Sequence, residues 1–517
     1  MAETRWTLVQ GMDWQTLSGK ARAAAPEAFG AEGTPLNLVD GKWEKPIRHK
    51  AIHSPIDGSA LGALPMLDLE SARQAVRASA LEFKEWSKVP LDERRRRVQA
   101  CLEALKSHRD LLAGLLVWEI GKPYSQAQVS VDRCISGVAW YLEQIEPMLA
   151  GRKPIGLVSN IASWNYPMSV LMHAVLVQAL AGNSVIAKTP SDGGLYTLTL
   201  SMALARRAGL PVSLVSGSGE QLSSALVRND DVACLSFVGG KTSGRDIAAS
   251  LYDRSKRYML EMEGVNAYGV WNFSDWNTLS KQLQKGFEFG KQRCTAYVRF
   301  VIERRLFPRF LSMYLDVVRS LQFGHPLLVE KPGDAPPNFA FGPLINERSV
   351  EELRGKVGEA LGLGAVALYE GSLDSGRFLP DQDTSAYMAP LALMNVPRNS
   401  KLYHSEPFGP VDTFVVVDSV AELVAEMNIS NGALVASIAC DDPIHAKEIS
   451  GEIRAFKVGI NQVRSRGDKD EAFGGIEASW KGSFVGGKYL VQAVTVGKAD
   501  DRLYGNFPDS RILPEQR

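Results

Sequence analysis

The sequence predicts an α/β protein built on parallel β-sheets. Between residues 155 and 275, short apolar runs alternate with segments of helical periodicity, and residues 276–470 repeat this alternation. The pattern is typical of βαβ units, in which a crossover helix joins two parallel strands. At roughly 100–200 residues per domain, the 517 residues are enough for several domains. Because ligands bind parallel sheets at the carboxyl ends of the strands, we expect the functional site at those ends.

The individual elements follow from apolar spacing and from the positions of Gly and Pro. Residues 1–36 are rich in Ala and Gly and weakly patterned, so we expect an N-terminal extension, with ordered structure beginning near Asn37. Helices are predicted over 70–87, 92–120, 168–182, 195–209, 278–289, 308–321 and 421–427, with one more from Thr242. Strands are predicted at 154–161, 183–190, 212–217, 233–240, 257–264, 297–303, 365–371 and 412–419, and a loop at 332–346.

The composition is that of an ordinary globular protein. Apolar residues make up 45% and charged residues 22%, which argues against a disordered, collagen-like or coiled-coil chain. The 58 Lys and Arg balance the 58 Asp and Glu, so no global positive field exists to attract nucleic acid or an anionic membrane. We therefore expect neither as a partner.

The cellular compartment is suggested by the cysteines and the termini. Five cysteines in so long a chain cannot form a disulfide framework and are expected to be reduced. The first residues lack the apolar core of a secretory signal, and the final ILPEQR carries no lipidation motif. The longest apolar stretch, 170–180, is too short to span a bilayer. A cytoplasmic location is expected.

Several common ligand-binding motifs are absent from the sequence. The segment Gly239–Gly244 contains the GKT of a phosphate-binding P-loop, but Leu235 stands where that loop needs Gly. The glycines of VSGSGEQL do not complete a G-x-G-x-x-G motif. The seven histidines lack metal-ligand spacing, so no metal is expected. His173, on an apolar helix, is predicted to be a packed histidine.

Three residues are candidates for chemistry, although each also has an ordinary structural explanation. Cys294 lies between a predicted helix and a predicted strand, and its neighbours Lys291 and Arg293 favour a thiolate. Glu261 ends an apolar strand, where a carboxylate is more often a capping or salt-bridged group. Asn165 occurs in SWNYP, where it is alternatively a helix N-cap.

These residues belong to a set of short motifs that occur in a fixed order. The set comprises Trp164-Asn165-Tyr166-Pro167, Ala187-Lys188-Thr189-Pro190, Phe237-Val238-Gly239-Gly240 followed by Gly244, Leu260-Glu261-Met262-Glu263-Gly264, Cys294 followed by Arg299, Glu406-Pro407-Phe408-Gly409-Pro410-Val411, and Phe473-Gly474-Gly475. Each motif is weak alone, but in this order the chain resembles the aldehyde dehydrogenase superfamily from about residue 37 to 500.

The resemblance implies a fold and an assembly. It implies a Rossmann-type parallel-sheet cofactor domain, an α/β catalytic domain and a small oligomerisation arm. Residues 37–138 and 155–262 would form the cofactor domain, 263–478 the catalytic domain, and 139–154 with 479–500 the oligomerisation segments. A strand in YLVQAVTV would belong to these segments, because pairing it across a two-fold axis satisfies its exposed edge. A homodimer or homotetramer is expected.

The resemblance also implies NAD(P)-dependent oxidation of a small-molecule aldehyde to the carboxylic acid. Cys294 would form the thiohemiacetal and thioester, Glu261 would act as general base in hydrolysis, and Asn165 would stabilise the oxyanion. The cofactor would be bound by Trp164, Lys188, Ser191, Gly219, Gly239, Gly240, Met262, Glu406 and Phe408. Adjacency to Asn165 and Cys294 in the sequence predicts that the substrate pocket is lined by Tyr166, Val170, His173, Arg293 and Thr295.

Departures from the family pattern leave alternatives open. Glu263 and Val265 stand where the family usually has Gly and Lys, and the segment after Phe473-Gly474-Gly475 is much altered. If the strand continued past Glu261, Glu263 would share its face, and like-charge repulsion would raise the pKa of the pair. Ser191 stands where NAD-preferring members have Glu, which favours NADP slightly over NAD. A catalytically weak or inactive homologue that acts as a binding or scaffold protein, or a CoA-acylating relative, remains an alternative.

Overall fold

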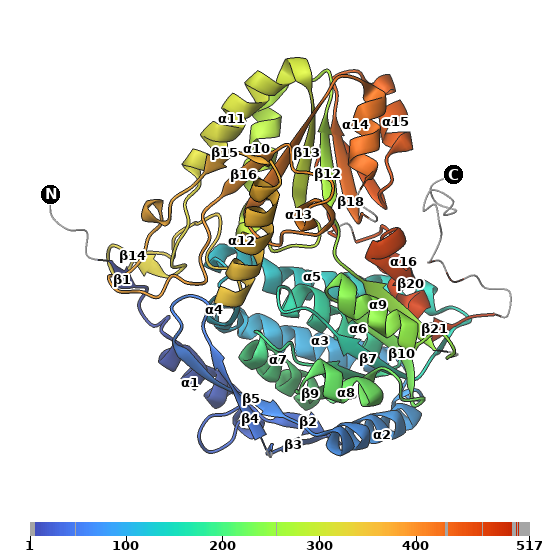
Figure 1. The fold of residues 1–517 in the computed structure, drawn as a ribbon. Helices are drawn as coiled ribbons and strands as arrows, with labels where there is room; N and C mark the ends of the chain where they lie inside the picture. The colour runs from blue at the N-terminus through green and yellow to red at the C-terminus, as the bar shows by residue number, and fades with distance from the viewer. Residues whose placement is uncertain are drawn as a thin grey trace.

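Two large sheets, each covered by helices, organise the computed structural model (Figure 1). The structure describes residues 6–46, 48–254, 256–429, 433–467 and 469–498, together with Leu503 and Gly505; the segment ILPEQR lies outside these residues. Both large sheets are mainly parallel, so the predicted α/β class is confirmed.

The first sheet has eight strands in the order β20-β11-β10-β7-β8-β9-β2-β3. The strands β11, β10, β7, β8 and β9 run parallel, and β20 and the β2–β3 pair join the two edges antiparallel. The bounds are Trp480–Gly482 (β20), Arg257–Glu261 (β11), Val232–Val238 (β10), Leu157–Ile161 (β7), Ser184–Lys188 (β8), Val212–Val215 (β9), Asn37–Val39 (β2) and Lys42–Glu44 (β3).

Helices cover both faces of this sheet, as parallel strands require. Ile186 of β8 packs in an apolar cluster with residues of α2 and α8, whereas Val185 and Ala187 belong to the main core on the other side. The helices of this half are α2 (Leu69–Trp86), α3 (Leu91–Ser107), α4 (Arg109–Ile120), α5 (Tyr124–Leu149), α6 (His173–Leu180), α7 (Leu195–Arg207), α8 (Gly219–Leu226) and α9 (Lys241–Ser250).

The second sheet has seven strands in the order β15-β16-β17-β13-β12-β18-β19, of which only β15 pairs antiparallel. Its strands are β15 (Val366–Glu370), β16 (Leu391–Met394), β17 (Val411–Val417), β13 (Tyr297–Glu303), β12 (Asn266–Val270), β18 (Val435–Ala439) and β19 (Lys457–Ile460). Figure 1 shows α10 (Trp276–Gly286) and α11 (Phe307–Ser320) on one side, and α14 (Val420–Asn428) and α15 (Pro443–Glu452) on the other. Two further helices of this half are α12 (Glu347–Gly362) and α13 (Lys401–His404). A separate hairpin pairs β4 (Arg48–His53) with β5 (Ala60–Met66).

The N-terminal residues are more ordered than predicted. Helix α1 (Trp14–Ala24) begins at Asp13, whose carboxylate accepts a hydrogen bond from the backbone N–H of Thr16 at 2.8 Å. Leu17 and Ala21 are buried in the main core, and β1 (Thr7–Leu8) pairs with β14 (Leu328–Val329). The expectation of an extension without ordered structure is therefore wrong. The buried stripe of α1 is narrow and contains small residues, so the apolar periodicity of its sequence is weak.

The single helix predicted over 92–120 is also wrong. His108, with φ −107° and ψ 15°, separates α3 from α4. Helix α4 is buried on nearly every side from Leu112 to Ile120. A helix that is apolar all round lacks the stripe that would mark its own start.

The strand predicted within residues 489–496 is mostly helix. Residues Gly487–Ala493 form α16, and only Thr495–Val496 (β21) pairs with Lys153–Pro154 (β6). Tyr489, Leu490 and Val491 are buried within the monomer, which satisfies their apolar surface without a second chain. Residues 139–149 belong to α5, and residues 499 and 500 lie outside the described part.

Within the described residues, none of the helices combines the length and apolar character needed to cross a membrane. In the same part of the chain, no group of three or more His, Cys, Asp or Glu side chains is arranged to hold a metal ion.

Candidate active site

The loop that carries Cys294 has an unusual backbone. It follows a short 3₁₀ turn, Glu288–Lys291, and leads into β13. Phe289 and Lys291 have positive φ values of 58° and 59°, a conformation that non-glycine residues rarely adopt. Such backbone persists only where its surroundings hold it in place.

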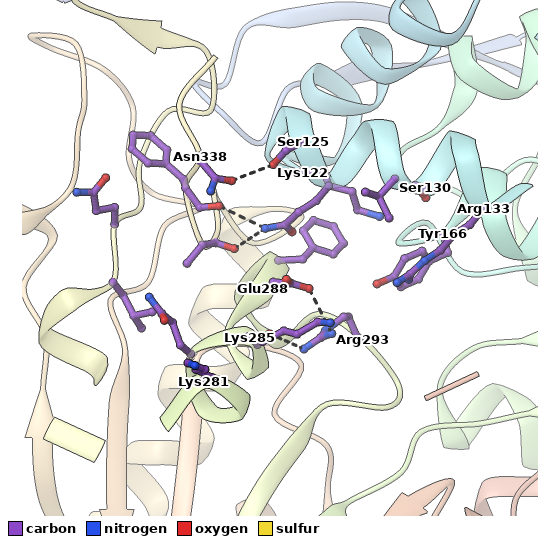
Figure 2. A pocket seen from close by; sticks show the side chains of 18 of the residues that line it. Lys122, Ser125, Ser130, Arg133, Tyr166, Lys281, Lys285, Glu288, Arg293 and Asn338 are labelled. Atoms are coloured by element: carbon purple, nitrogen blue, oxygen red, sulfur yellow. Dashed lines mark hydrogen bonds and ion pairs between the residues drawn. The ribbon is translucent and has the colours of Figure 1, made fainter. Parts of the chain in front are cut away.

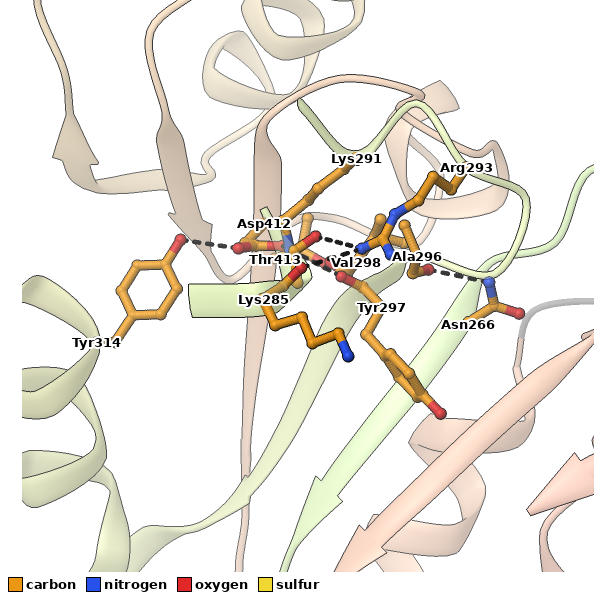
Figure 3. Close-up of polar contacts among 11 residues, drawn as sticks. Asn266, Lys285, Lys291, Arg293, Ala296, Tyr297, Val298, Tyr314, Asp412 and Thr413 are labelled. Carbon is orange, nitrogen blue, oxygen red and sulfur yellow. Dashed lines mark hydrogen bonds and ion pairs between the residues drawn. The ribbon is translucent and has the colours of Figure 1, made fainter. Parts of the chain in front are cut away.

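A buried ion pair behind the loop provides that support (Figure 3). The ammonium of Lys291 donates to the carboxylate of Asp412 at 2.7 Å and to the carbonyl of Tyr297 at 2.9 Å. The hydroxyl of Tyr314 donates to the other oxygen of Asp412 at 2.9 Å. Both charged side chains are fully buried, so each depends on these partners.

Two asparagines fix the rest of the loop. The side-chain amide of Asn266, on β12, donates to the carbonyls of Cys294 at 2.8 Å and Ala296 at 2.9 Å. The amide of Asn165 donates to the carbonyl of Gln292 at 2.9 Å. Asn165 precedes a π-helical turn at Pro167–Met172, and it is no helix N-cap by its side chain. The predicted oxyanion donor therefore lies against the predicted nucleophile loop.

The thiol of Cys294 donates a hydrogen bond to Glu261, with Sγ 3.2 Å from Oε1. Burial and the carboxylates of Glu261 and Glu406 raise the pKa of Cys294 well above its usual range. The predicted thiolate-favouring cationic neighbourhood is therefore wrong. Lys291 is paired with Asp412, and Arg293 donates to the carbonyl of Gly286 at 2.7 Å. The group beside the thiol is a proton acceptor, the carboxylate of Glu261, and not the cations that were expected there.

The other four cysteines lie away from this arrangement. Cys101, Cys134, Cys234 and Cys440 are buried in the core, whereas Cys294 is half-buried. Burial raises the pKa of Cys101 and of Cys234 to about 12. Cys294 is thus the cysteine that meets a cavity.

A cavity of about 260 Å³ brings most of the predicted site residues together. It lies between the two sheets, because its walls come from the ends of β10 and β11, from the Cys294 loop and from the segment after α13. Of the predicted residues it is lined by Trp164, Asn165, Tyr166, Val170, Gly239, Gly240, Glu261, Met262, Cys294, Glu406 and Phe408.

Three predicted cofactor residues lie outside this cavity. Lys188 ends β8, half-buried Ser191 follows it, and Gly219 begins α8 after β9. Burial lowers the pKa of Lys188 to about 8, and its ammonium donates to the carbonyl of Thr189 at 3.0 Å. Since β8 and β9 are parallel to β10 and β11, these residues lie along the same edge of the first sheet as the cavity.

Glu263 does not share a strand face with Glu261, so that expectation is wrong. Strand β11 ends at Glu261, and the two carboxylates have separate partners. Glu263 accepts hydrogen bonds from the backbone N–H groups of Lys241 at 3.0 Å and Glu406 at 3.2 Å. Glu261 is bound by Cys294 and by an ion pair to Arg466.

A second, larger cavity of about 800 Å³ shares the wall formed by Tyr166 (Figure 2). Figure 2 shows Lys281, Lys285 and Arg293 on one side, and Arg133 beside Tyr166 on the other. Glu288 is the acidic residue of its lining among the residues that the structure describes, and it pairs with Arg293 at 3.9 Å. The lining is therefore strongly basic. His173 and Thr295, both predicted pocket walls, line neither cavity in the described chain, and His173 is packed against Tyr141.

Two residues of the site were missed by sequence reasoning. Lys122 is buried, donates to the carbonyl of Asn165 at 2.8 Å, and lies 3.9 Å above the ring of Tyr166. Arg466 reaches Glu261 from the loop after β19. In the sequence, Lys122 directly follows Gly121, the residue that ends α4. Arginines stand at positions 464 and 466. These were the available signals for the two residues.

Two mainly parallel sheets, with a cysteine, a carboxylate and an amide gathered in a cavity between them, define an α/β protein with an enzyme-like site. The model of the aldehyde dehydrogenase family matches residues 43–499. The chain belongs to the aldehyde dehydrogenase family.

Individual relatives are distant but cover nearly the whole chain. The chain is 25% identical over 472 residues to the mitochondrial succinate-semialdehyde dehydrogenase of Oryza sativa subsp. japonica, covering 87% of this chain and 86% of the relative. It is 26% identical over 447 residues to the NADP(+)-dependent D-glyceraldehyde dehydrogenase of Picrophilus torridus, covering 82% and 87%. The crystal structure of the NADP-dependent glyceraldehyde-3-phosphate dehydrogenase of Bacillus halodurans in complex with NADP matches with a TM-score of 0.80 and 25% identity, covering 90% of this chain and 98% of that one.

Proposed function

We propose that this protein oxidises an aldehyde to the carboxylic acid with NADP or NAD, through a covalent intermediate on Cys294. The observation that carries the proposal is the hydrogen bond from the Cys294 thiol to Glu261 at 3.2 Å, in a cavity that Asn165 also lines. A nucleophile with an adjacent general base is the arrangement that activates a thiol.

The proposed reaction uses these three side chains in order. Glu261 accepts the thiol proton, and the sulfur of Cys294 adds to the carbonyl carbon. The amide of Asn165 donates to the resulting oxyanion, and one such donor is worth about 2.7–4 kcal/mol. A bound nicotinamide would supply the acceptor for the hydride on the same carbon, and Cys294 would then hold the acyl group as a thioester. Glu261 first releases the thiol proton to solvent and then accepts a proton from the water that adds to the thioester. The C–S bond breaks, Glu261 returns this proton to the departing sulfur, and the carboxylic acid is released with the Cys294 thiol restored.

The residues of the cavity fit a nicotinamide dinucleotide. Glu406 is 8% exposed, and its Oε1 has no hydrogen-bond partner in the described structure, so a ribose hydroxyl would satisfy it. A Cβ at Gly240 would meet only open space, which leaves room beside the first turn of α9. Lys188 and Ser191, on the same sheet edge, would hold the adenosine ribose, and we propose a slight preference for NADP. Trp164, Gly219, Gly239, Met262 and Phe408 complete the proposed cofactor site.

We further propose an anionic aldehyde as the substrate. The larger cavity borders the Cys294 loop through Arg293 and is also lined by Arg133, Lys281 and Lys285, against one carboxylate in the described chain. Relatives bear the names succinate-semialdehyde dehydrogenase and aspartate-semialdehyde dehydrogenase, and those aldehydes carry a carboxylate. A positive cavity raises the local concentration of such substrates.

The proposal is tested by a steady-state assay of nicotinamide reduction over a panel of aldehydes that pairs each anionic aldehyde with a neutral analogue of equal length. Turnover without CoA, with higher kcat/KM for the anionic member of each pair, is expected. Turnover that requires CoA would indicate an acyl-transferring enzyme, and no turnover with any aldehyde would indicate a binding or scaffold protein.

A cytoplasmic homodimer or homotetramer is proposed as the working form. The short β6–β21 ribbon supports it, because Val496 of β21 is 46% exposed in the monomer. Light scattering at micromolar concentration tests this, and a monomeric mass would contradict it.

A further inference from the structure

The position of Glu263 is set by its backbone. The hydroxyl of Ser479 donates to the carbonyl of Glu263 at 2.9 Å, and the carbonyl of Ser479 accepts from the N–H of Met262 at 2.9 Å. The turn after β11 is thereby fixed on both sides of the Cα of Glu263. Its carboxylate reaches the N–H of Lys241 with Oε1 and the N–H of Glu406 with Oε2.

The first of these contacts is at the N-terminus of a helix. Lys241 is the first residue of α9, and Gly240 before it supplies no side-chain cap. Backbone N–H groups in the first turn of a helix lack intrahelical partners and attract anions, including phosphates. The carboxylate of Glu263 supplies such an anion from within the chain.

Glu263, the acceptor in this contact, lines the proposed dinucleotide cavity. Gly239, Gly240, Glu263 and Glu406 all line it. Glu406 is buried at the same place, and its Oε1 has no hydrogen-bond partner in the described residues. Such an unsatisfied carboxylate oxygen indicates a ligand site. A pyrophosphate that approaches the first turn of α9 would meet both an occupied N–H and a negative charge.

We propose that Glu263 is an intramolecular competitor for the cofactor's pyrophosphate, and that it lowers the affinity of this chain for nicotinamide dinucleotides. The inference rests on the proposed function, because it takes the cavity as the cofactor site. The carboxylate must leave the N–H of Lys241 before the pyrophosphate binds there. Glu263 is thus a residue that sets cofactor affinity.

The experiment is isothermal titration of the full-length chain with NADP, NAD and adenosine. Glu263→Gln keeps the size of the side chain and removes its charge, whereas Glu263→Gly removes the side chain. Both variants are expected to bind each dinucleotide at least about tenfold more tightly than wild type, because like charges near 4 Å repel strongly at a protein surface. Adenosine has no phosphate, so its affinity is expected to stay unchanged.

The matched control is Glu422→Gln. Glu422 lies in the first turn of α14, where it accepts from the N–H of Asp418 at 2.8 Å, away from the cavity. This variant loses the same charge at another helix N-terminus, and its dinucleotide affinity is expected to equal that of wild type. Thermal unfolding of all variants reports separately on the loss of a helix cap.

The outcomes separate the inference from the proposed function. Wild-type binding that neither Glu263 variant tightens overturns the inference and leaves the proposed function standing. An equal gain for adenosine also overturns it, since the effect would not pass through the pyrophosphate. If no dinucleotide binds to wild type or to either variant, the inference is wrong and the proposed cofactor chemistry fails as well.

Discussion

The Cys294 loop and the adenosine end of the proposed cofactor site differ in how firmly they are held. In the loop, the ammonium of Lys291 binds a buried carboxylate. Asn266 and Asn165, which lie on two other segments, donate to backbone carbonyls of the loop. At the end of β8, Ser191 is half-buried and Asp192 is exposed. One region is fixed by buried polar contacts, whereas the other is open to solvent.

This difference bears on which positions tolerate substitution. A buried donor or acceptor that loses its partner costs about 1–3 kcal/mol, and a buried charge costs more. Substitutions that remove these contacts of the Cys294 loop are therefore expected to lower the free energy of unfolding. A substitution at the half-buried Ser191 is expected to cost less stability, so cofactor preference can change while the Cys294 loop keeps its geometry.

The largest effect is expected at the nucleophile. Cys294→Ala removes the only thiol that meets the smaller cavity among the described residues. Turnover should fall by at least about 10³-fold, a typical loss when a covalent nucleophile is removed. Cofactor affinity, measured by titration, should stay near that of wild type.

The control for this variant is Cys440→Ala. Cys440 is buried at the end of β18, away from both cavities, so turnover should persist. Retention of more than a few per cent activity in Cys294→Ala would remove Cys294 from the mechanism.

The next effect tests how firmly the loop is held. Lys291→Met leaves the carboxylate of Asp412 buried with only the hydroxyl of Tyr314 as a side-chain donor in the described structure. Breaking a buried pair from one side costs about 3–5 kcal/mol, measured as the free energy of unfolding in urea. The double variant Lys291→Met/Asp412→Leu should recover most of this loss. A single variant that loses less than about 1 kcal/mol would show that the pair does not hold the loop.

A third effect concerns the pH dependence of the thiol. Burial is the main cause of the raised pKa of Cys294, and the carboxylate of Glu261 raises it further. Glu261→Gln removes that charge, so the pKa of Cys294 should fall. The pH profile of its alkylation by iodoacetamide should then move to lower pH. Turnover should nevertheless drop by about 10²-fold, because a general base is lost.

Glu288→Gln is the control for the pH profile. Glu288 lies in the same segment as Cys294 but lines the larger cavity, so its charge should leave the profile unchanged. A profile that stays fixed in Glu261→Gln would mean that the 3.2 Å contact does not govern the thiol.

Short motifs identified residues that share a cavity, because each motif places one residue at the end of a strand or the start of a turn. Asn165, Glu261 and Cys294 were identified in this way, and they meet in one cavity. The electrostatics were not predictable. The ammonium of Lys291 pairs with Asp412, 121 residues further along the chain, and no local pattern gives the partner of a buried charge.

The fold shows the same limit. The parallel sheets follow from the alternation of apolar runs with helical segments, but α16 was expected to be a strand. YLVQAVTV is apolar and β-branched enough for either structure. Its burial within the monomer decides the outcome, and burial depends on distant residues. Arg466 escaped notice for a similar reason, because its partner Glu261 lies 205 residues earlier.

The smallest effect is expected at Ser191, in the adenosine end of the proposed cofactor site, where this residue would help to select NADP over NAD. A carboxylate at this position would repel a 2′-phosphate, whereas the serine hydroxyl can donate to it beside the ammonium of Lys188. Burial lowers the pKa of Lys188 to about 8, so at neutral pH this side chain is still largely charged. Ser191→Glu should lower the ratio of kcat/KM for NADP to that for NAD by about tenfold, since a few kcal/mol of repulsion is partly screened by solvent.

Asp192→Asn is the control, because Asp192 is exposed and is the nearest alternative source of an NAD preference. A strong preference of wild type for NAD would contradict the proposed NADP lean. A ratio that changes in Asp192→Asn but not in Ser191→Glu would move the discriminating position by one residue.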